Sequence, residues 1–89
     1  MNSVMNSVII SGTIKNIVYK LVDRGNIYAL IILKLEVEKC KKNIEIIGKN
    51  RLADDIYRKY SVMDNVIING YLRKIKDNMI IIVKDIEKI

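Results

Sequence analysis

The side chains of this chain that could do chemistry are tyrosine rings and cationic groups. The 89 residues include five tyrosines and no histidine, tryptophan or phenylalanine, and 16 lysines and arginines stand against 10 acidic residues. A formal net charge of +6 favours a polyanionic partner, and a flat ring beside a cation suits a nucleobase beside its phosphate. An AT-rich genome also enriches lysine, isoleucine and asparagine, so the charge alone does not decide between these explanations.

The same set of residues argues against catalysis. The chain has no histidine, no glycine-rich phosphate loop and no metal-ligand spacing around Cys40. Asp54 and Asp55 are adjacent, but they diverge around a helix and cannot easily share one substrate. We therefore expect a protein that is not an enzyme and that holds neither a metal nor a cofactor.

One segment has the periodicity of a short amphipathic helix. Leu52, Ile56 and Tyr60 recur every four residues, and Ala53 and Tyr57 flank them to complete an apolar stripe. Because both tyrosines belong to this stripe, we expect them to pack in the core.

Polar residues suit the ends of this helix. Asn50 is placed to cap its start, and Asp54 and Arg58 have the i,i+4 order that stabilises helices, as do Asp55 and Lys59. Such charges are ordinarily the solvated face of a helix and need no functional explanation.

The remaining apolar segments are rich in β-branched residues and read as five strands. They span residues 8–17, 27–37, 44–48, 66–75 and 79–89. The polar segments that connect them include residues 20–26, 39–43 and 76–78. In the last of these we expect a tight hairpin, because Asp77 and Asn78 tolerate a positive φ.

The order of the elements predicts the fold. Gly12, Gly48 and Gly70 fall inside or at the end of strands, where glycine permits the bends that a small barrel needs. Five strands with one helix between the third and the fourth is the order of the oligonucleotide/oligosaccharide-binding (OB) fold. We predict an all-β, five-stranded OB-fold Greek-key barrel with one short helix between strands 3 and 4, since a β-sandwich would need more strands.

The length allows one small domain. We expect residues 1–89 to form a single OB-fold domain, with residues 1–4 frayed because the opening Met-Asn-Ser-Val is repeated and only its second copy leads into a strand. No apolar segment approaches membrane-spanning length and no secretory signal is apparent. A lone Cys40 suits a reducing compartment, so we expect a cytoplasmic protein without a membrane partner.

Several of these segments resemble the bacterial single-stranded DNA-binding protein (SSB) family. Residues 6–14, Asn-Ser-Val-Ile-Ile-Ser-Gly-Thr-Ile, are similar to the family's first strand, and residues 25–37 to its second. Residues 51–53, Tyr60 and the alternating segment 66–73 match its helix and fourth strand in order. The resemblance covers nearly the whole chain and implies single-stranded DNA binding in replication, replication restart or repair.

The departures from the family pattern are informative. By eye, positions that carry base-stacking aromatic residues in the family fall on Ile31, Asn43 and Lys49. The family's long loops are short here, and its acidic C-terminal tail is not seen before Ile89. The resemblance therefore points to a tail-less form like the primosomal protein PriB, and Lys49 to a phosphate contact in place of a stacking contact.

Charge and tyrosine together give the candidate nucleic-acid-binding residues. Lys15 and Arg24 are held in reserve, and either surface filling or stacking explains an exposed tyrosine on a sheet. The candidates are Lys34, Lys49, Arg51, Tyr71, Arg73, Lys74, Lys76, Tyr28 and Tyr19.

The strands at residues 27–37 and 79–89 carry apolar residues on both faces. A small barrel buries one face of each strand, so we expect a homo-oligomer, a dimer or tetramer, to cover the other. The expected partners are single-stranded DNA, with RNA left open, and replication proteins. The alternative is an OB-fold protein-interaction adaptor with weak or no nucleic-acid binding, which the missing aromatic residues and short loops favour.

Overall fold

Alternating runs of β-branched residues form strands throughout the computed structural model, which describes residues 7–35 and 42–89. In chain order the elements are β1 (Val8–Val22), the 3-10 turn η1 (Asp23–Gly25), β2 (Asn26–Leu35), β3 (Asn43–Lys49), α1 (Arg51–Lys59), β4 (Asn65–Ile75) and β5 (Asn78–Lys88). The predicted fraying of residues 1–4 and most of the predicted connection at 39–43 lie outside the described residues.

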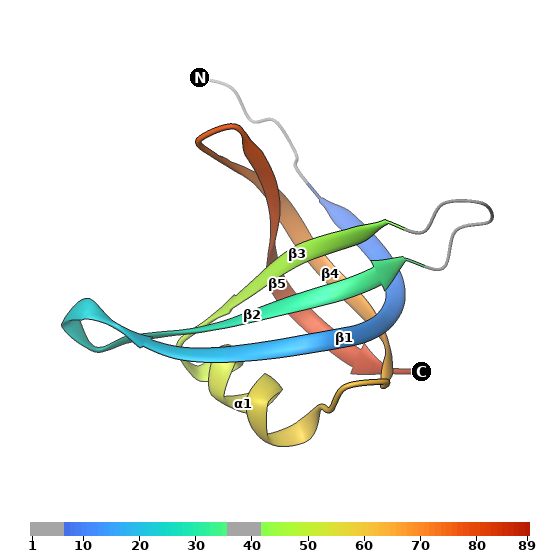
Figure 1. Cartoon of the computed structure of the whole chain (residues 1–89), viewed down its shortest axis with the longest axis horizontal. Helices are drawn as coiled ribbons and strands as arrows, with labels where there is room; N and C mark the ends of the chain where they lie inside the picture. The colour runs from blue at the N-terminus through green and yellow to red at the C-terminus, as the bar shows by residue number, and fades with distance from the viewer. Residues whose placement is uncertain (1–6, 36–41) are drawn as a thin grey trace.

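The strands close into a barrel in the order β1-β2-β3-β5-β4, with β4 returning to β1 (Figure 1). All neighbours are antiparallel except β3 and β5, which run parallel and pair at Ile46 with Ile81 and at Ile47 with Ile82. With α1 between β3 and β4, this is the predicted OB-fold barrel, and the predicted fold class is confirmed.

β1 closes the barrel by pairing with two strands in turn. It pairs with β4 from Val8 to Thr13 and with β2 from Gly12 onward, and its register shifts between Ile14 and Asn16. At the crossing point a Cβ on Gly12 would overlap the backbone oxygen of Lys34. Glycine is therefore needed at this barrel bend, as predicted, because the two backbones approach too closely for a side chain.

The connection predicted at residues 20–26 is much shorter than expected. β1 and β2 remain paired as far as Val22 and Asn26, and only η1 separates them. The turn is this short because Arg24 and Gly25 both take positive φ, of 68° and 77°. The paired strands consequently extend past the barrel as an arm, at the left of Figure 1.

The hairpin predicted between β4 and β5 is present, but its geometry differs in detail. Ile75 pairs with Asn78, which leaves Lys76 and Asp77 as the loop. The positive φ belongs to Lys76, at 56°, and Asn78 already lies in β5. A lysine thus takes the conformation that we expected of Asp77 or Asn78.

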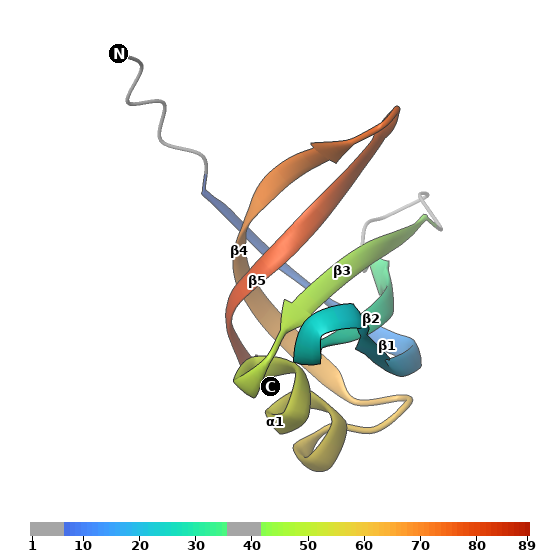
Figure 2. The same ribbon diagram turned by 90° about the vertical axis from the view of Figure 1, so that its left-hand side faces the viewer.

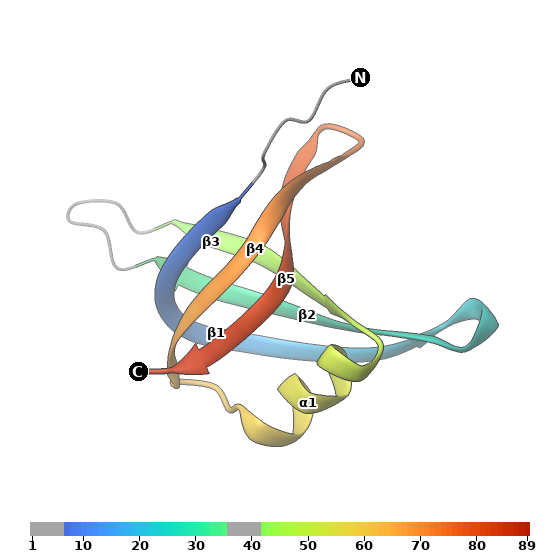
Figure 3. The same cartoon turned by 180° about the vertical axis from the view of Figure 1, so that it is seen from behind.

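α1 lies across one end of the barrel (Figures 2 and 3). Ala53 and Ile56 are fully buried there, and α1 contacts β2 and β3. A Cβ on Gly48 would lie 2.7 Å from Cδ1 of Ile56, so glycine at this position lets the helix pack directly on β3. The helix therefore closes the barrel with its apolar stripe, as its periodicity predicted.

Two details of the helix differ from the prediction. Tyr57 is 56% exposed and lies outside the core, because it stacks on Tyr19 at the edge of the stripe. Asn50 occupies the N-cap position but does not cap the helix, since its Oδ1 accepts a hydrogen bond from the Ile27 backbone N–H at 3.1 Å. The predicted pairing of Asp54 with Arg58 is confirmed, with 3.1 Å between Oδ2 and Nε.

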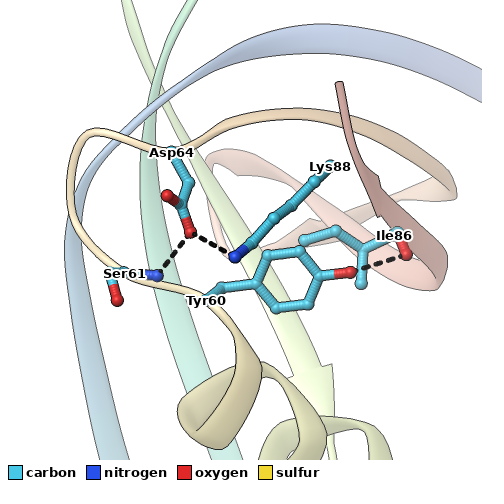
Figure 4. Close-up of polar contacts among 5 residues, drawn as sticks. All are labelled: Tyr60, Ser61, Asp64, Ile86 and Lys88. Atoms are coloured by element: carbon cyan, nitrogen blue, oxygen red, sulfur yellow. Dashed lines mark hydrogen bonds and ion pairs between the residues drawn. The ribbon is translucent and has the colours of Figure 1, made fainter.

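The end of β5 is tied to the loop after α1 (Figure 4). The Tyr60 hydroxyl donates to the Ile86 carbonyl oxygen at 2.9 Å, and Lys88 Nζ lies 3.4 Å from Asp64 Oδ2. The same carboxylate oxygen of Asp64 accepts from the Ser61 backbone N–H at 2.8 Å. Tyr60 also packs against the hydrophobic core, so the core role predicted for this tyrosine is confirmed.

Among the described residues, no helix has the length and apolar character needed to cross a membrane.

Candidate nucleic-acid interface

The outer face of the barrel carries a row of cationic and aromatic side chains across three strands. Tyr28 on β2 pairs in register with Lys20 on β1 and with Lys49 on β3. Neighbouring strands lie about 4.8 Å apart and paired residues point to the same face, so the tyrosine ring stands between two lysines. The tertiary structure thus joins residues that are up to 29 positions apart in the sequence.

A groove of about 410 Å³ opens beside this row. It is lined by Tyr28, Ile47, Lys49, Arg73 and Ile82, which come from β2, β3, β4 and β5. Three of the predicted residues, Tyr28, Lys49 and Arg73, are therefore brought together at one site. They meet because the parallel pairing of β3 with β5 places β4 within reach of β2 across the barrel surface.

The floor of the groove is apolar, with Ile47 half-buried and Ile82 buried. Ile82 is 4% exposed and Ile80, which pairs with Arg73, is 8% exposed, yet neither belongs to the central core cluster. The prediction that a partner subunit must cover the second face of β5 is therefore wrong for these two residues, because their own barrel covers them. An apolar floor with a polar rim is the usual construction of a ligand site.

Asn50 fixes the end of the groove. Its backbone N–H donates to the Ile27 carbonyl oxygen at 2.6 Å, and its Oδ1 accepts from the Ile27 N–H at 3.1 Å. Asn50 has a positive φ of 52° where it makes these bonds. The two hydrogen bonds hold β3 against β2 next to Tyr28 and Lys49.

The groove offers hydrogen-bond donors, positive charge and one aromatic ring. No carboxylate is among the lining residues that the structure describes, and Lys49 and Arg73 have donors but no acceptor. An anionic group with a flat apolar portion matches this set, since the cations can contact phosphate oxygens while Tyr28 stacks on a base.

The other predicted residues lie outside the groove. Tyr71 on β4 pairs with Ile82. Lys84 Nζ lies 5.9 Å from the centre of the Tyr71 ring, so a lysine already lies close to this tyrosine. Tyr19 lies on the helix side of the sheet. The remaining predicted cations are spread along the surface: Lys34 near the far end of β2, Arg51 at the start of α1, Lys74 on β4 and Lys76 in the hairpin loop.

Sequence reasoning missed Lys20 and Lys84, and also the floor residues Ile47 and Ile82. The sequence predicts a loop at Lys20, which hides the strand register of this residue with Tyr28. Alternation along the strand predicts Tyr28 on the face opposite Ile27, Ala29 and Ile31, but only the pairing between strands shows which side chains lie beside it.

Three positions correspond, by the family resemblance, to stacking residues of the family, and they lie in different environments in the structure. Ile31 is fully buried in the core, so no ligand can touch it, whereas Asn43 begins β3 and is exposed. Lys49 lines the groove. Ile31 therefore offers no surface for stacking in this barrel.

A second feature of the outer surface is apolar. Ile9 on β1 is 71% exposed and Ile67 on β4 is 41% exposed, and these residues pair with Asn69 and Ser11 respectively. Between Val8 and Ser11, β1 pairs only with β4, so its other edge has no strand partner in the described part of the chain. Asn69 Oδ1 is buried there without a hydrogen-bond partner.

Metal binding has no candidate in the ranges 7–35 and 42–89, where no three histidine, cysteine, aspartate or glutamate residues form a group able to hold an ion.

The closed five-stranded barrel with α1 between β3 and β4 defines the structural class as an OB-fold, and similar solved structures include SSB domains. An SSB domain from Synechococcus sp. superposes with a TM-score of 0.83 over 98% of this chain and 99% of its own, at 17% sequence identity. The protein PriB from Ralstonia solanacearum superposes with a TM-score of 0.81 over 96% of this chain and 98% of its own, at 14% identity.

A third similar structure is the second single-stranded DNA-binding protein from Mycobacterium smegmatis. It gives a TM-score of 0.81 over 93% of this chain and 87% of its own, at 12% identity. No family model matches the sequence, and no curated protein matches it. The resemblance to SSB and PriB proteins is therefore confirmed as a likeness of fold.

Proposed function

We propose that this protein binds single-stranded DNA in the groove on its outer face and does so without catalysis, in replication, replication restart or repair. The observation that carries the proposal is the convergence of Tyr28, Lys49 and Arg73 on one groove with an apolar floor. Single-strand binders of this fold combine a positively charged groove with aromatic rings on which bases stack. Similar solved structures include proteins described as single-stranded DNA-binding, which supports the same activity.

Lys20 extends the proposed contact surface beyond the groove. It flanks Tyr28 on the side opposite Lys49, so the ring has a cation on each side. A phosphodiester chain that runs across the strands would place consecutive phosphates near these cations while a base lies on the ring. Lys74 and Lys76 continue the positive charge along β4 toward the hairpin.

Titration of a fluorescent oligo-dT at two salt concentrations tests the proposal. We expect Lys49→Glu to weaken binding, and to lower the dependence of log K on log salt by about 0.7 for the lost phosphate contact. Lys15→Glu is the matched control, because Lys15 is also a lysine on a strand but does not line the groove. Equal affinity of the unaltered protein for duplex and single strand would contradict the proposal. The same titration with oligo-rU compares the affinity for RNA with that for DNA.

The second candidate function is a protein-interaction adaptor. It is favoured by the single aromatic ring in the groove and by the apolar floor at Ile47 and Ile82, both of which also suit a peptide. In that case oligo-dT binds weakly and Lys49→Glu and Lys15→Glu reduce it equally. The titration above therefore separates the two functions.

We also infer that the protein forms a homodimer or tetramer through the outer face of β1 and β4. Exposed Ile9 and Ile67 lie together on this face, because Ile9 pairs with Asn69 and Ile67 pairs with Ser11 across β1 and β4. A two-fold axis beside β1 would bury both isoleucines between two copies. This face differs from the groove, so self-association leaves Tyr28, Lys49 and Arg73 accessible.

A further inference from the structure

Tyr57 is an exposed ring that the barrel holds in a fixed orientation. Its ring lies 4.5 Å from that of Tyr19, centre to centre, with 23° between the two planes, which is a stacked arrangement. With Tyr57 56% exposed, one face of its ring is covered by Tyr19 while much of the side chain meets solvent. The stack has no role in the groove described above.

The supporting ring is itself anchored to the helix. The Tyr19 hydroxyl donates to Asp54 Oδ1 at 3.2 Å, and Asp54 Oδ2 accepts from Arg58 Nε at 3.1 Å. Partial burial, and after it the Asp54 carboxylate, raise the pKa of the Tyr19 hydroxyl, so this group stays a donor at a pH where a free tyrosine would ionise. Tyr57 consequently stacks on a ring whose position is set by a hydrogen-bonded chain.

The stack and the groove lie on opposite faces of the same sheet. Tyr19 pairs with Ala29, whereas the next residue, Lys20, pairs with Tyr28. Since successive side chains along a strand point to opposite faces, Lys20 and Tyr28 point outward while Tyr19 points toward α1. A strand of nucleic acid that leaves the groove past Lys20 reaches Tyr57 by passing the edge of β1, which in this part pairs only with β2.

We propose that Tyr57, supported by Tyr19, is a second platform on which a base of single-stranded nucleic acid stacks once the strand is long enough to leave the groove. The inference rests on the proposed function, because it supposes that the groove binds the same strand. A nucleobase suits the site since stacking on a preoriented ring loses little conformational freedom. The negative charge of Asp54 is paired with Arg58, whose side chain is 72% exposed and can face a phosphate.

The natural chain has no tryptophan, so one introduced tryptophan reports on one position. Three single variants are titrated with dT8 and dT40. They are Tyr28→Trp in the groove, Tyr57→Trp on the platform and Val62→Trp at an exposed site after the helix. We expect both lengths to quench Trp fluorescence in the groove variant and only dT40 to quench it in the platform variant. The Val62→Trp variant should respond to neither length.

The outcomes separate this inference from the function on which it rests. If the groove variant responds and the platform variant does not respond to dT40, the platform is overturned while the groove remains. If the groove variant responds to neither length, the proposed function itself fails. A platform response as strong with dT8 as with dT40 also overturns the inference, because it removes the dependence on strand length.

Affinity gives a second measurement that needs no tryptophan. Tyr57→Ala should weaken dT40 binding by about fivefold or more, while Tyr57→Phe, which keeps the ring, should stay near the unaltered protein. Neither substitution should change dT8 binding. Equal loss of dT8 and dT40 binding in Tyr57→Ala, with an unchanged melting temperature, would instead show that this residue acts on the groove and would overturn the platform.

Discussion

At the scale of single residues, Tyr60 shows how one side chain joins separate parts of the barrel. It follows α1 directly, its hydroxyl donates to the Ile86 carbonyl oxygen of β5, and Lys88 Nζ lies 5.7 Å from the centre of its ring. Burial, and after it the nearby carboxylates led by Asp85, raise the pKa of the Tyr60 hydroxyl. The hydroxyl is therefore a donor in the folded protein at a pH where a free tyrosine would ionise.

Replacing Tyr60 by Phe should destabilise the fold by about 0.5–1.5 kcal/mol at neutral pH, since the hydrogen bond to Ile86 is lost. Because the folded-state pKa is raised, the contribution of the hydroxyl is complete below about pH 10 and is lost as the pH rises through the folded value. The difference between the unaltered protein and Tyr60→Phe should then narrow from pH 9 to pH 11 in urea unfolding. A constant difference over that interval would contradict this account.

The groove also depends on one ring. Tyr28→Ala should weaken oligo-dT binding by about 1–3 kcal/mol, because it removes the only aromatic side chain that lines the groove, whereas Tyr28→Phe should retain most of the affinity. Fluorescence anisotropy with a labelled oligo-dT measures both variants. Equal losses in the two would mean that the hydroxyl, and not the stacking surface, carries the contact.

At the scale of elements, the contact between α1 and β3 decides how the barrel is closed. Gly48 leaves room for the Cδ1 methyl of Ile56, and both residues are buried. An added Cβ would lie 2.7 Å from that methyl, which is closer than real Cβ contacts allow. The helix can approach the strand only because these two side chains are complementary in size.

This complementarity predicts a compensating pair of substitutions. Gly48→Ala should destabilise the fold by about 1–3 kcal/mol through overpacking, and Ile56→Val should cost about 0.5–1.5 kcal/mol through the lost methyl. Ile56→Val removes the Cδ1 atom with which the new Cβ collides. The double variant should therefore be destabilised by less than the sum of the two single variants. Chemical denaturation of the four proteins measures the coupling, and strict additivity would show that the helix shifts instead.

At the scale of the whole molecule, the barrel carries the two proposed contact faces and one arm. The groove crosses β2, β3, β4 and β5, while exposed Ile9 and Ile67 lie on β1 and β4. The β1–β2 arm and the β4–β5 hairpin project from the barrel in different directions (Figure 1). A second copy on the β1 and β4 face would therefore leave the groove of each copy open.

Ile9→Lys should shift the protein toward the monomer in sedimentation at micromolar concentration, because it places a charge at the centre of the proposed contact. Met63→Lys is the matched control, since Met63 is 74% exposed and apolar but lies in the loop between α1 and β4. Its sedimentation should match that of the unaltered protein. A monomeric unaltered protein would contradict the proposed assembly.

Much of the architecture could be predicted because it depends on local patterns. β-branched runs, the four-residue spacing of Leu52, Ile56 and Tyr60 and the polar turn at residues 76–78 each follow from neighbours in the chain. The length of β1 could not be predicted, since its continuation to Val22 depends on pairing with Asn26 across a very short turn. The spacing of Tyr57 predicts a core position for a similar reason, because it does not reveal Tyr19 beside it.

The sequence by itself determined the number and order of the strands, the position of the helix and the candidate cations and tyrosines. It could do so because alternation and helical spacing are properties of consecutive residues. Only the tertiary structure decided that Tyr28, Lys49 and Arg73 share a groove while Tyr19 faces the helix. That decision rests on strand register, and shifting the register by one residue would move every side chain of the strand to the opposite face.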